Sequence, residues 1–313
     1  MSESSRRVGA VAWRPTRSKP AVVVCFGEVL WDCLPKGLFL GGAPINAAYH
    51  LAKQGLQVLP VTAVGRDFLG DEVLRRVENW GVDTRFIGRD RNHPTGTVGA
   101  TLDSSGVATY QIRGDVAWDH IPVPPALRSI APAPAAFVFG TLSLRGAPNR
   151  KALQTALNAW PAALRVVDLN FRAPFDTNAV TRFALLRAQL VKLNDSELSK
   201  LTGEKGKTES SLRRGTLRLA KQYRLRCICV TAGDRGAGLL WKDEWLWENA
   251  RHVAVRDTVG AGDAFLGALL GELLLKGSSP ARALVQACRL GEFVASHDGA
   301  TPDYQLDRRG QPR

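Results

Sequence analysis

The chain has 313 residues, and with 45% hydrophobic residues it can bury a substantial core. No run reaches the roughly 18 apolar residues of a membrane span, and the N-terminus lacks the apolar segment of a secretory signal. We therefore expect a globular, cytoplasmic protein without a membrane partner. The formal net charge of +13 and a pI near 10.0 make a nucleic-acid binder the first alternative to an enzyme.

Residues 1–20 are polar, basic and interrupted by Pro15 and Pro20, which predicts a disordered basic leader. Much of the charge excess lies in this leader and in the last ten residues. No RNP, zinc-finger or basic-zipper pattern occurs, so the sequence does not favour nucleic acid as a partner. We expect one domain over residues 21–303, followed by a tail at 304–313.

From Ala21 onward the chain repeats a short apolar run, a glycine-containing turn and a helical segment. The expected strands are 22–26, 58–64, 136–139, 165–169, 190–193 and 227–231, and the first expected helices are 44–54 and 68–80. Apolar strands that alternate with helices predict an α/β fold with a mostly parallel sheet covered on both faces. Ligands of such folds bind at the carboxyl ends of the strands.

Residues 95–112 alternate apolar and polar residues, with a turn expected at 103–106. This pattern predicts a hairpin outside the main sheet that could cover a pocket as a lid. A second two-stranded segment is expected at 238–247, with its turn at 242–244.

The cysteines and histidines of the sequence give no sign of a metal site. The five cysteines are an odd number without paired metal-ligand spacing, which favours structural thiols in a reducing compartment. The five histidines are scattered singly along the chain and give no support for a zinc site.

The stretch 257–265, DTVGAGDAF, carries the strongest chemical signal. An apolar helix is expected to begin there, so Gly260, Ala261 and Gly262 form its first turn, where free N–H groups and the helix dipole favour an anion. An acid beside an anion site suits phosphoryl transfer, in which Asp263 would accept a hydroxyl proton. The alternative is that Asp263 caps the helix and the glycines merely turn the chain.

This stretch resembles the carboxyl-terminal signature of the ribokinase-like carbohydrate kinases, also called the phosphofructokinase B family. Further segments similar to that family are GGAPINAA at 41–48, GRDFLG at 65–70, KLNDSE at 192–197 and VTAGDRG at 230–236. The resemblance covers residues 21–303. It implies a three-layer α/β/α sandwich with a small β lid from about 28–41 and 95–118, and transfer of the γ-phosphate of ATP to a sugar hydroxyl.

The resemblance also implies residue roles. Asp263 would be the general base, and Gly260, Ala261 and Gly262 would form the anion hole. Asn194 and Glu197 would act on Mg²⁺ and the phosphates through water, while Thr231, Gly233 and Gly236 would line the nucleotide. A monovalent cation, usually K⁺, would be held by Asp257, the carbonyl of Val259 and carbonyls near Gly299.

The bacterial fructokinase branch is the most similar, through segments such as FGEVLWD at 26–32 and DLNFR at 168–172. This similarity predicts sugar contacts from Asp32, Gly42, Asn46, Tyr110 and Arg172. It also predicts a homodimer through the lid.

Three other outcomes stay open. Related kinases phosphorylate 2-keto-3-deoxygluconate, ribose or nucleosides on the same fold, and Arg113 near Tyr110 could bind a substrate carboxylate. A sugar or nucleotide sensor and a nucleic-acid binder on this fold are the non-enzyme alternatives.

Overall fold

The computed structural model describes residues 21–34, 37–102 and 108–313. The expected leader 1–20 and the expected turn at 103–106 lie outside these residues. The order of elements confirms the alternation of strands and helices. The helices are α1 (Ala43–Lys53), α2 (Phe68–Asn79), α3 (Ala147–Ala159), α4 (Asn178–Leu185), α5 (Asp195–Thr202), α6 (Glu209–Tyr223), α7 (Ala261–Leu270) and α8 (Pro280–Ala295).

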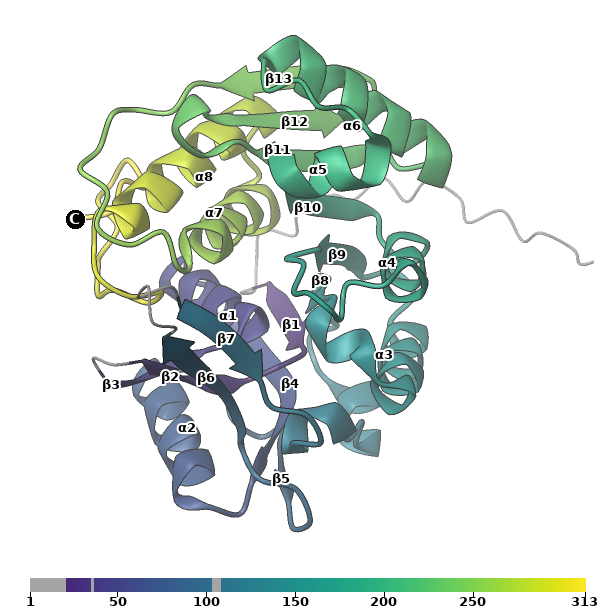
Figure 1. Ribbon diagram of the computed structural model, residues 1–313, viewed down its shortest axis with the longest axis vertical. Coiled ribbons are helices and arrows are strands. Elements are labelled where there is room, and N and C mark those ends of the chain that lie inside the picture. Colours follow the sequence, from purple (N-terminus) through teal and green to yellow (C-terminus); the bar gives the residue numbers. More distant parts are fainter. Residues whose placement is uncertain (1–20, 35–36, 103–107) are drawn as a thin grey trace, which may run out of the picture.

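A large sheet runs through the molecule in the strand order β13-β12-β11-β10-β9-β8-β1-β4-β5 (Figure 1). Its strands are β1 (Val22–Phe26), β4 (Gln57–Gly65), β5 (Ile87–Asp90), β8 (Ala136–Gly140), β9 (Leu164–Asp168), β10 (Leu190–Asn194), β11 (Cys227–Thr231), β12 (Ala237–Trp241) and β13 (Glu244–Glu248). All neighbouring pairs from β5 to β11 are parallel, whereas β12 and β13 pair antiparallel. The parallel strands therefore direct their carboxyl ends to one edge.

Helices cover both faces of this sheet, as the apolar strands predict. In β1, Val23 and Cys25 pack with side chains of α1, α7 and α8, whereas Val22, Val24 and Phe26 pack with α3, α4 and α6 on the other face. Because strand side chains alternate between faces, each strand contributes to two cores. The three-layer α/β/α architecture is confirmed.

A small four-stranded sheet with the order β3-β2-β6-β7 lies beside the large one (Figure 1). Its strands are β2 (Leu30–Leu34), β3 (Gly37–Gly41), β6 (Gly96–Leu102) and β7 (Ala108–Ile112). It leaves the large sheet at the carboxyl ends of β1 and β5. These are the segments from which a lid is expected.

The end of the chain packs back onto the core. The Tyr304 side chain is 2% exposed, and its hydroxyl lies 3.1 Å from Nδ1 of the buried His50.

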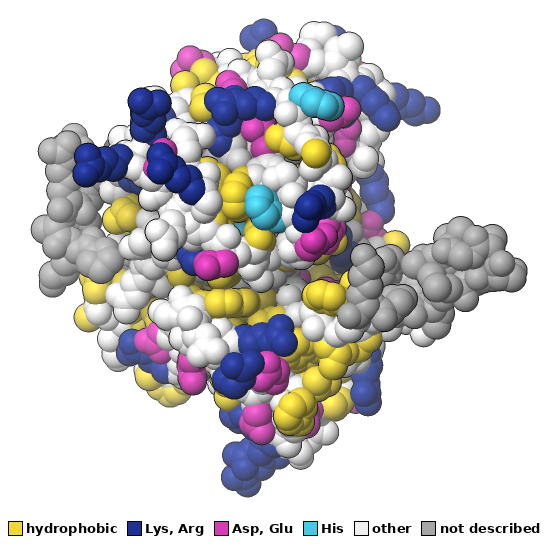
Figure 2. All heavy atoms as spheres, turned by 90° about the vertical axis from the view of Figure 1, so that its left-hand side faces the viewer, with side chains coloured by type: hydrophobic (Ala, Val, Ile, Leu, Met, Phe, Trp, Pro, Cys, Tyr) yellow, Lys and Arg dark blue, Asp and Glu magenta, His cyan; other side chains and the backbone are white. Residues whose placement is uncertain are grey.

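Among the described residues, no helix is both long and apolar enough to cross a membrane. All five cysteines are free thiols. On the face shown in Figure 2, lysine and arginine side chains are interspersed with acidic and neutral ones.

Candidate active site

Asp263 lies in the first turn of α7 and is 8% exposed. Its Oδ2 accepts a hydrogen bond of 2.9 Å from Nδ2 of Asn46, a residue of α1. Burial, reinforced by the nearby Asp168 carboxylate, raises the pKa of Asp263 to about 7. A carboxylate with such a pKa is suited to exchanging protons near neutrality.

The turn before Asp263 needs small residues. Gly260 has φ of +77°, and a Cβ there would lie 2.5 Å from Cα of Ala300. A Cβ on Gly262 would lie 2.6 Å from Nζ of Lys192. The turn is therefore held closely between two other segments. The Ala261 amide donates to the Thr258 carbonyl at 3.3 Å, so an anion at this turn would compete for that amide.

Lys192 on β10 is a buried cation beside this turn, and the sequence reasoning assigned it no role. Its Nζ donates to Oδ2 of Asp168 at 2.7 Å, and both side chains are at least nine-tenths buried. Burial alone would lower the pKa of Lys192, but the carboxylates of Asp168 and Asp263 outweigh it and raise this pKa. The ammonium is therefore charged at neutral pH, next to the helix start where an anion is expected. The sequence signal was a lysine inside a buried apolar strand, where lysine is almost never found unless paired.

The expected sugar contacts lie on two sides of this centre. Asp32 is on β2 of the small sheet, and burial raises its pKa to about 6 while the charge of Arg172 opposes this. Gly42 is the N-cap of α1 with φ of +108°, where a Cβ would lie 2.5 Å from the Glu28 carbonyl oxygen.

The other two expected contacts are less defined. Arg172 is exposed and donates to the carbonyl of Phe171 at 3.0 Å. Its charge nevertheless lowers the pKa of the half-buried Asp32 and of the buried Asp263, against the effect of burial. Tyr110 lies in β7, but its side chain falls outside the described part of the structure.

Several buried polar atoms near these carboxyl ends have no hydrogen-bond partner among the residues that the structure describes. They are Oε2 of Glu28, Oδ1 of Asn46, Oγ of Ser143 and Oδ1 of Asp168. Native proteins leave few such atoms unpaired, because each costs about 1–3 kcal/mol. Groups of this kind are completed when a ligand with several hydroxyls binds. Glu28 and Asp168 belong to the motifs FGEVLWD and DLNFR, but the sequence alone assigns them no role, because it does not show which polar atoms remain unpaired.

Asn194 and Glu197 form a capping box at the start of α5. The Asn194 side chain accepts from the Glu197 amide at 2.9 Å, and Glu197 accepts from the Asn194 amide at 2.8 Å. The other oxygen of Glu197 accepts from the Phe171 amide at 2.6 Å. Both carboxylate oxygens thus hold backbone groups. Each keeps one further lone pair, so a contact with Mg²⁺ through water is compatible with this geometry.

The expected nucleotide residues lie at the end of β11, next to Asn194. Thr231 is the last residue of β11 and pairs with Asn194 across the sheet. A Cβ on Gly236 would lie 2.0 Å from the carbonyl oxygen of Glu248, so this glycine is required by packing. Gly233 has φ of +60° and open space around it. The structure places all three at the expected edge, and their contact with a nucleotide stays a prediction.

The two loops expected to hold a monovalent cation meet at Asp257. Its Oδ1 accepts from the Val259 amide at 2.9 Å, and its Oδ2 accepts from the Gly299 amide at 3.3 Å. Asp257 therefore joins two segments 42 residues apart. Carboxylate and carbonyl oxygens are the ligands that hard cations take, so the residues present fit such an ion.

The sequence matches the family model described as "pfkB family carbohydrate kinase" over residues 26–306. The chain belongs to the PfkB family of carbohydrate kinases. It is a sugar kinase with the ribokinase-like fold, as the sequence resemblance implied.

Named relatives refine the placement within the PfkB family. The chain is similar to "Probable fructokinase-2" of Arabidopsis thaliana, with 30% identity over 91% of this chain and 93% of the relative. It is similar to "Fructokinase" of Salmonella typhimurium, with 28% identity over 93% of this chain and 99% of the relative. The crystal structure of fructokinase from Vibrio cholerae O395 in its fructose, ADP and calcium ion bound form superposes with a TM-score of 0.76, at 23% identity, over 90% of this chain and 94% of that chain.

Proposed function

We propose that this PfkB kinase transfers the γ-phosphate of ATP to a primary hydroxyl of fructose, and that the product is fructose 6-phosphate. The observation that carries the proposal is Asp263, a buried acid with a pKa of about 7 that lies among unpaired polar atoms at the strand ends. The fructokinase names of the relatives support fructose over other sugars.

In this mechanism the Asp263 carboxylate takes the proton of the sugar hydroxyl while that oxygen attacks the γ-phosphorus. The bond from the γ-phosphorus to the bridging oxygen breaks, ADP leaves, and Asp263 later releases the proton to solvent. The side-chain amide of Asn46 holds the carboxylate in position. The turn at Gly260–Gly262 and the ammonium of Lys192 stabilise the charge on the transferred phosphoryl group.

Two cations complete the proposal. Mg²⁺ would neutralise the phosphate charge, and Glu197 with Asn194 would hold its water shell. A monovalent cation, K⁺ by family resemblance, would be held by Asp257 with carbonyls at Val259 and near Gly299, and would fix the position of the loop before α7. Activity measured with Na⁺ or Li⁺ in place of K⁺ tests the second site, since a kinase without it shows no dependence on the monovalent ion.

A substrate panel tests the assignment. ADP release is measured with fructose, ribose, 2-keto-3-deoxygluconate and nucleosides at matched concentrations, and fructose should give the highest kcat/KM. Robust turnover of another compound without turnover of fructose would replace the substrate but keep the kinase. Loss of salt-sensitive DNA binding on deletion of residues 1–20, with no turnover of any sugar, would favour the nucleic-acid alternative.

We also propose a homodimer through the small sheet. Strand β3 exposes Leu38 by 48% and Phe39 by 41%, which is unusual for two adjacent apolar residues on a short strand. In sedimentation experiments, the wild type should be a dimer and the Phe39→Glu variant should be a monomer. A monomeric wild type at micromolar concentration contradicts this part of the proposal.

A further inference from the structure

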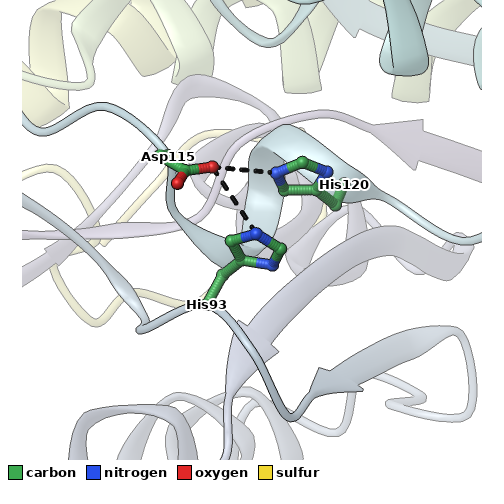
Figure 3. Close-up of side chains that lie close together, drawn as sticks. All are labelled: His93, Asp115 and His120. Carbon is green, nitrogen blue, oxygen red and sulfur yellow. Dashed lines mark hydrogen bonds and ion pairs between the residues drawn. The ribbon is translucent and has the colours of Figure 1, made fainter.

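Two of the histidines that are isolated in the sequence come together at the base of the small sheet. His93 lies between β5 and β6, Asp115 follows β7, and His120 ends the short helical turn Ala117–His120 (Figure 3). One oxygen of Asp115, Oδ1, lies 3.5 Å from Nε2 of His93 and 3.2 Å from Nε2 of His120. The three ligand atoms lie within 4.8 Å of one another, and no other such group of three metal-ligating side chains was found in the described ranges.

His93 is oriented as metal-binding histidines are. Its other ring nitrogen, Nδ1, lies 2.9 Å from Oδ2 of Asp90, and Asp90 is itself fixed by the backbone amides of Asn92 and His93. A histidine that donates its Nδ1 proton to a carboxylate presents the Nε2 lone pair outward. Here Nε2 of His93 lies 3.5 Å from Oδ1 of Asp115, so a cation bound by both atoms would bridge them.

The backbone that carries these side chains is held in place. The Ala117 amide donates to the Pro94 carbonyl at 2.8 Å, which joins the residue after His93 to the turn that ends at His120. Asp115 has φ of +53°, a conformation that is uncommon for residues other than glycine. The Asp119 carboxylate, paired with Arg145, accepts from the Val116 amide and so holds the segment between the two ligands.

We propose that His93, Asp115 and His120 bind a divalent transition metal ion of the Zn²⁺ class. Two neutral imidazoles and one carboxylate are a typical donor set for Zn²⁺ with a fourth position left for water. The two rings are stacked with centroids 3.9 Å apart, so His120, which is 37% exposed at its side chain, rotates out of the stack to direct its lone pair at the ion. Oδ1 of Asp115 lies 3.5 and 3.2 Å from the two nitrogens, and two ligands of a tetrahedral zinc with bonds of about 2.0–2.1 Å are about 3.3 Å apart.

The position of this site gives it a consequence for the small sheet. His93 lies three residues before β6, and Asp115 lies three residues after β7. A bound ion therefore links the entry and the exit of the β6–β7 hairpin, and local opening of that hairpin becomes less frequent while the ion is bound.

Titration of the full-length protein with Zn²⁺ and with Co²⁺ tests the proposal. We expect one Co²⁺ per chain with an absorption spectrum of nitrogen and oxygen ligands and without the sulfur-to-metal band that the free cysteines would give. His120→Ala and Asp115→Asn should each weaken binding by at least tenfold. Asp90→Asn removes the carboxylate that faces Nδ1 of His93, and it should weaken metal binding by about tenfold. Amide exchange in residues 96–99 and 111–112 should slow on addition of Zn²⁺.

The matched controls are His252→Ala and Asp243→Asn. Both residues are exposed and lie outside the cluster, so these variants should bind the metal ion as the wild type does. Asn tolerates the backbone conformation of Asp115, so Asp115→Asn separates the loss of a ligand from a loss of structure. The proposal is overturned if the wild type binds neither ion at micromolar concentrations. It is also overturned if His120→Ala and Asp115→Asn bind as the wild type does, since the ion would then lie elsewhere.

Discussion

The acids of the candidate site, Asp168 at the end of β9, Glu197 on α5 and Asp263 on α7, differ in how their oxygens are satisfied. Glu197 gives both oxygens to backbone amides, of Asn194 and Phe171. Asp168 instead accepts from the ammonium of Lys192, and Asp263 accepts from the side-chain amide of Asn46. Within the described residues, Oδ1 of Asp168 and Oδ1 of Asn46 keep no partner. The first arrangement is complete without a ligand, and the second is not. The difference supports the proposal that Asp263 is the base, and it gives Glu197 a structural role at the start of α5.

The largest effect should follow from removal of the base. Asp263→Asn keeps the size of the side chain but cannot accept a proton, so kcat should fall by about 10²–10⁴. The KM for ATP should change little, because the base acts on the sugar hydroxyl. Steady-state kinetics at saturating fructose measure this, and thermal melting confirms that the variant is folded. A kcat within tenfold of the wild type would remove Asp263 from this role.

Removal of the buried cation should lower the stability of the protein as well as its activity. Lys192→Met leaves the carboxylates of Asp168 and Asp263 buried without a counter-charge, and should lower the free energy of unfolding by about 3–5 kcal/mol. Urea unfolding measures it. The double variant Lys192→Met, Asp168→Leu should recover much of the loss, because no unpaired charge of that pair is left. If the double variant is no more stable than the single one, the ion pair is not the cause.

The pH profile should reflect the raised pKa of Asp263, about 7. The base is active when ionised, so kcat/KM should fall about tenfold per pH unit below that value. Asn46→Ala removes a hydrogen bond that favours the ionised form, and its acidic limb should move to higher pH. An unshifted limb in this variant would show that another group titrates.

The same shift predicts a pH dependence of stability with a defined sign. The folded pKa of Asp263, about 7, exceeds the unfolded value of about 3.9, so its stabilising contribution is present below pH 4 and is lost as the pH rises to 7. The melting temperature of Asp263→Asn relative to the wild type should therefore be higher at pH 8 than at pH 5. Equal differences at both pH values would contradict the buried, protonated state.

The smallest effect is expected at the capping box. Glu197→Gln replaces one of the two accepting oxygens with an NH2 group, so one of the two hydrogen bonds to backbone amides is lost, which should cost about 1–3 kcal/mol of stability. It should also raise the Mg²⁺ concentration needed for half-maximal activity, because the charge near the ion's water shell is lost. Ser196→Ala, one position earlier on α5, is the matched control. An unchanged Mg²⁺ requirement would leave Glu197 with its structural role alone.

The fold could be predicted from the sequence, because apolar runs and glycine-containing turns indicate local structure directly. The run Val22–Phe26 became β1 with the expected bounds, and the hairpin at 95–112 became β6 and β7. The glycine motif also predicted that Asp263 lies at a helix start. What it could not predict is burial and pairing between distant segments, such as the ion pair of Lys192 with Asp168 and the approach of His93 to His120. Both depend on the packing of elements that are separate in the chain.

The hydrogen bond between Asn46 and Asp263 joins residues 217 positions apart. A contact of such long sequence separation carries a large loop-closure cost, which slows folding. During synthesis the first strands and α1 leave the ribosome long before α7 exists. An incomplete chain can therefore carry the expected sugar contacts on α1 and β2 without the proposed base, so the proposed mechanism requires that the carboxyl-terminal helices have docked.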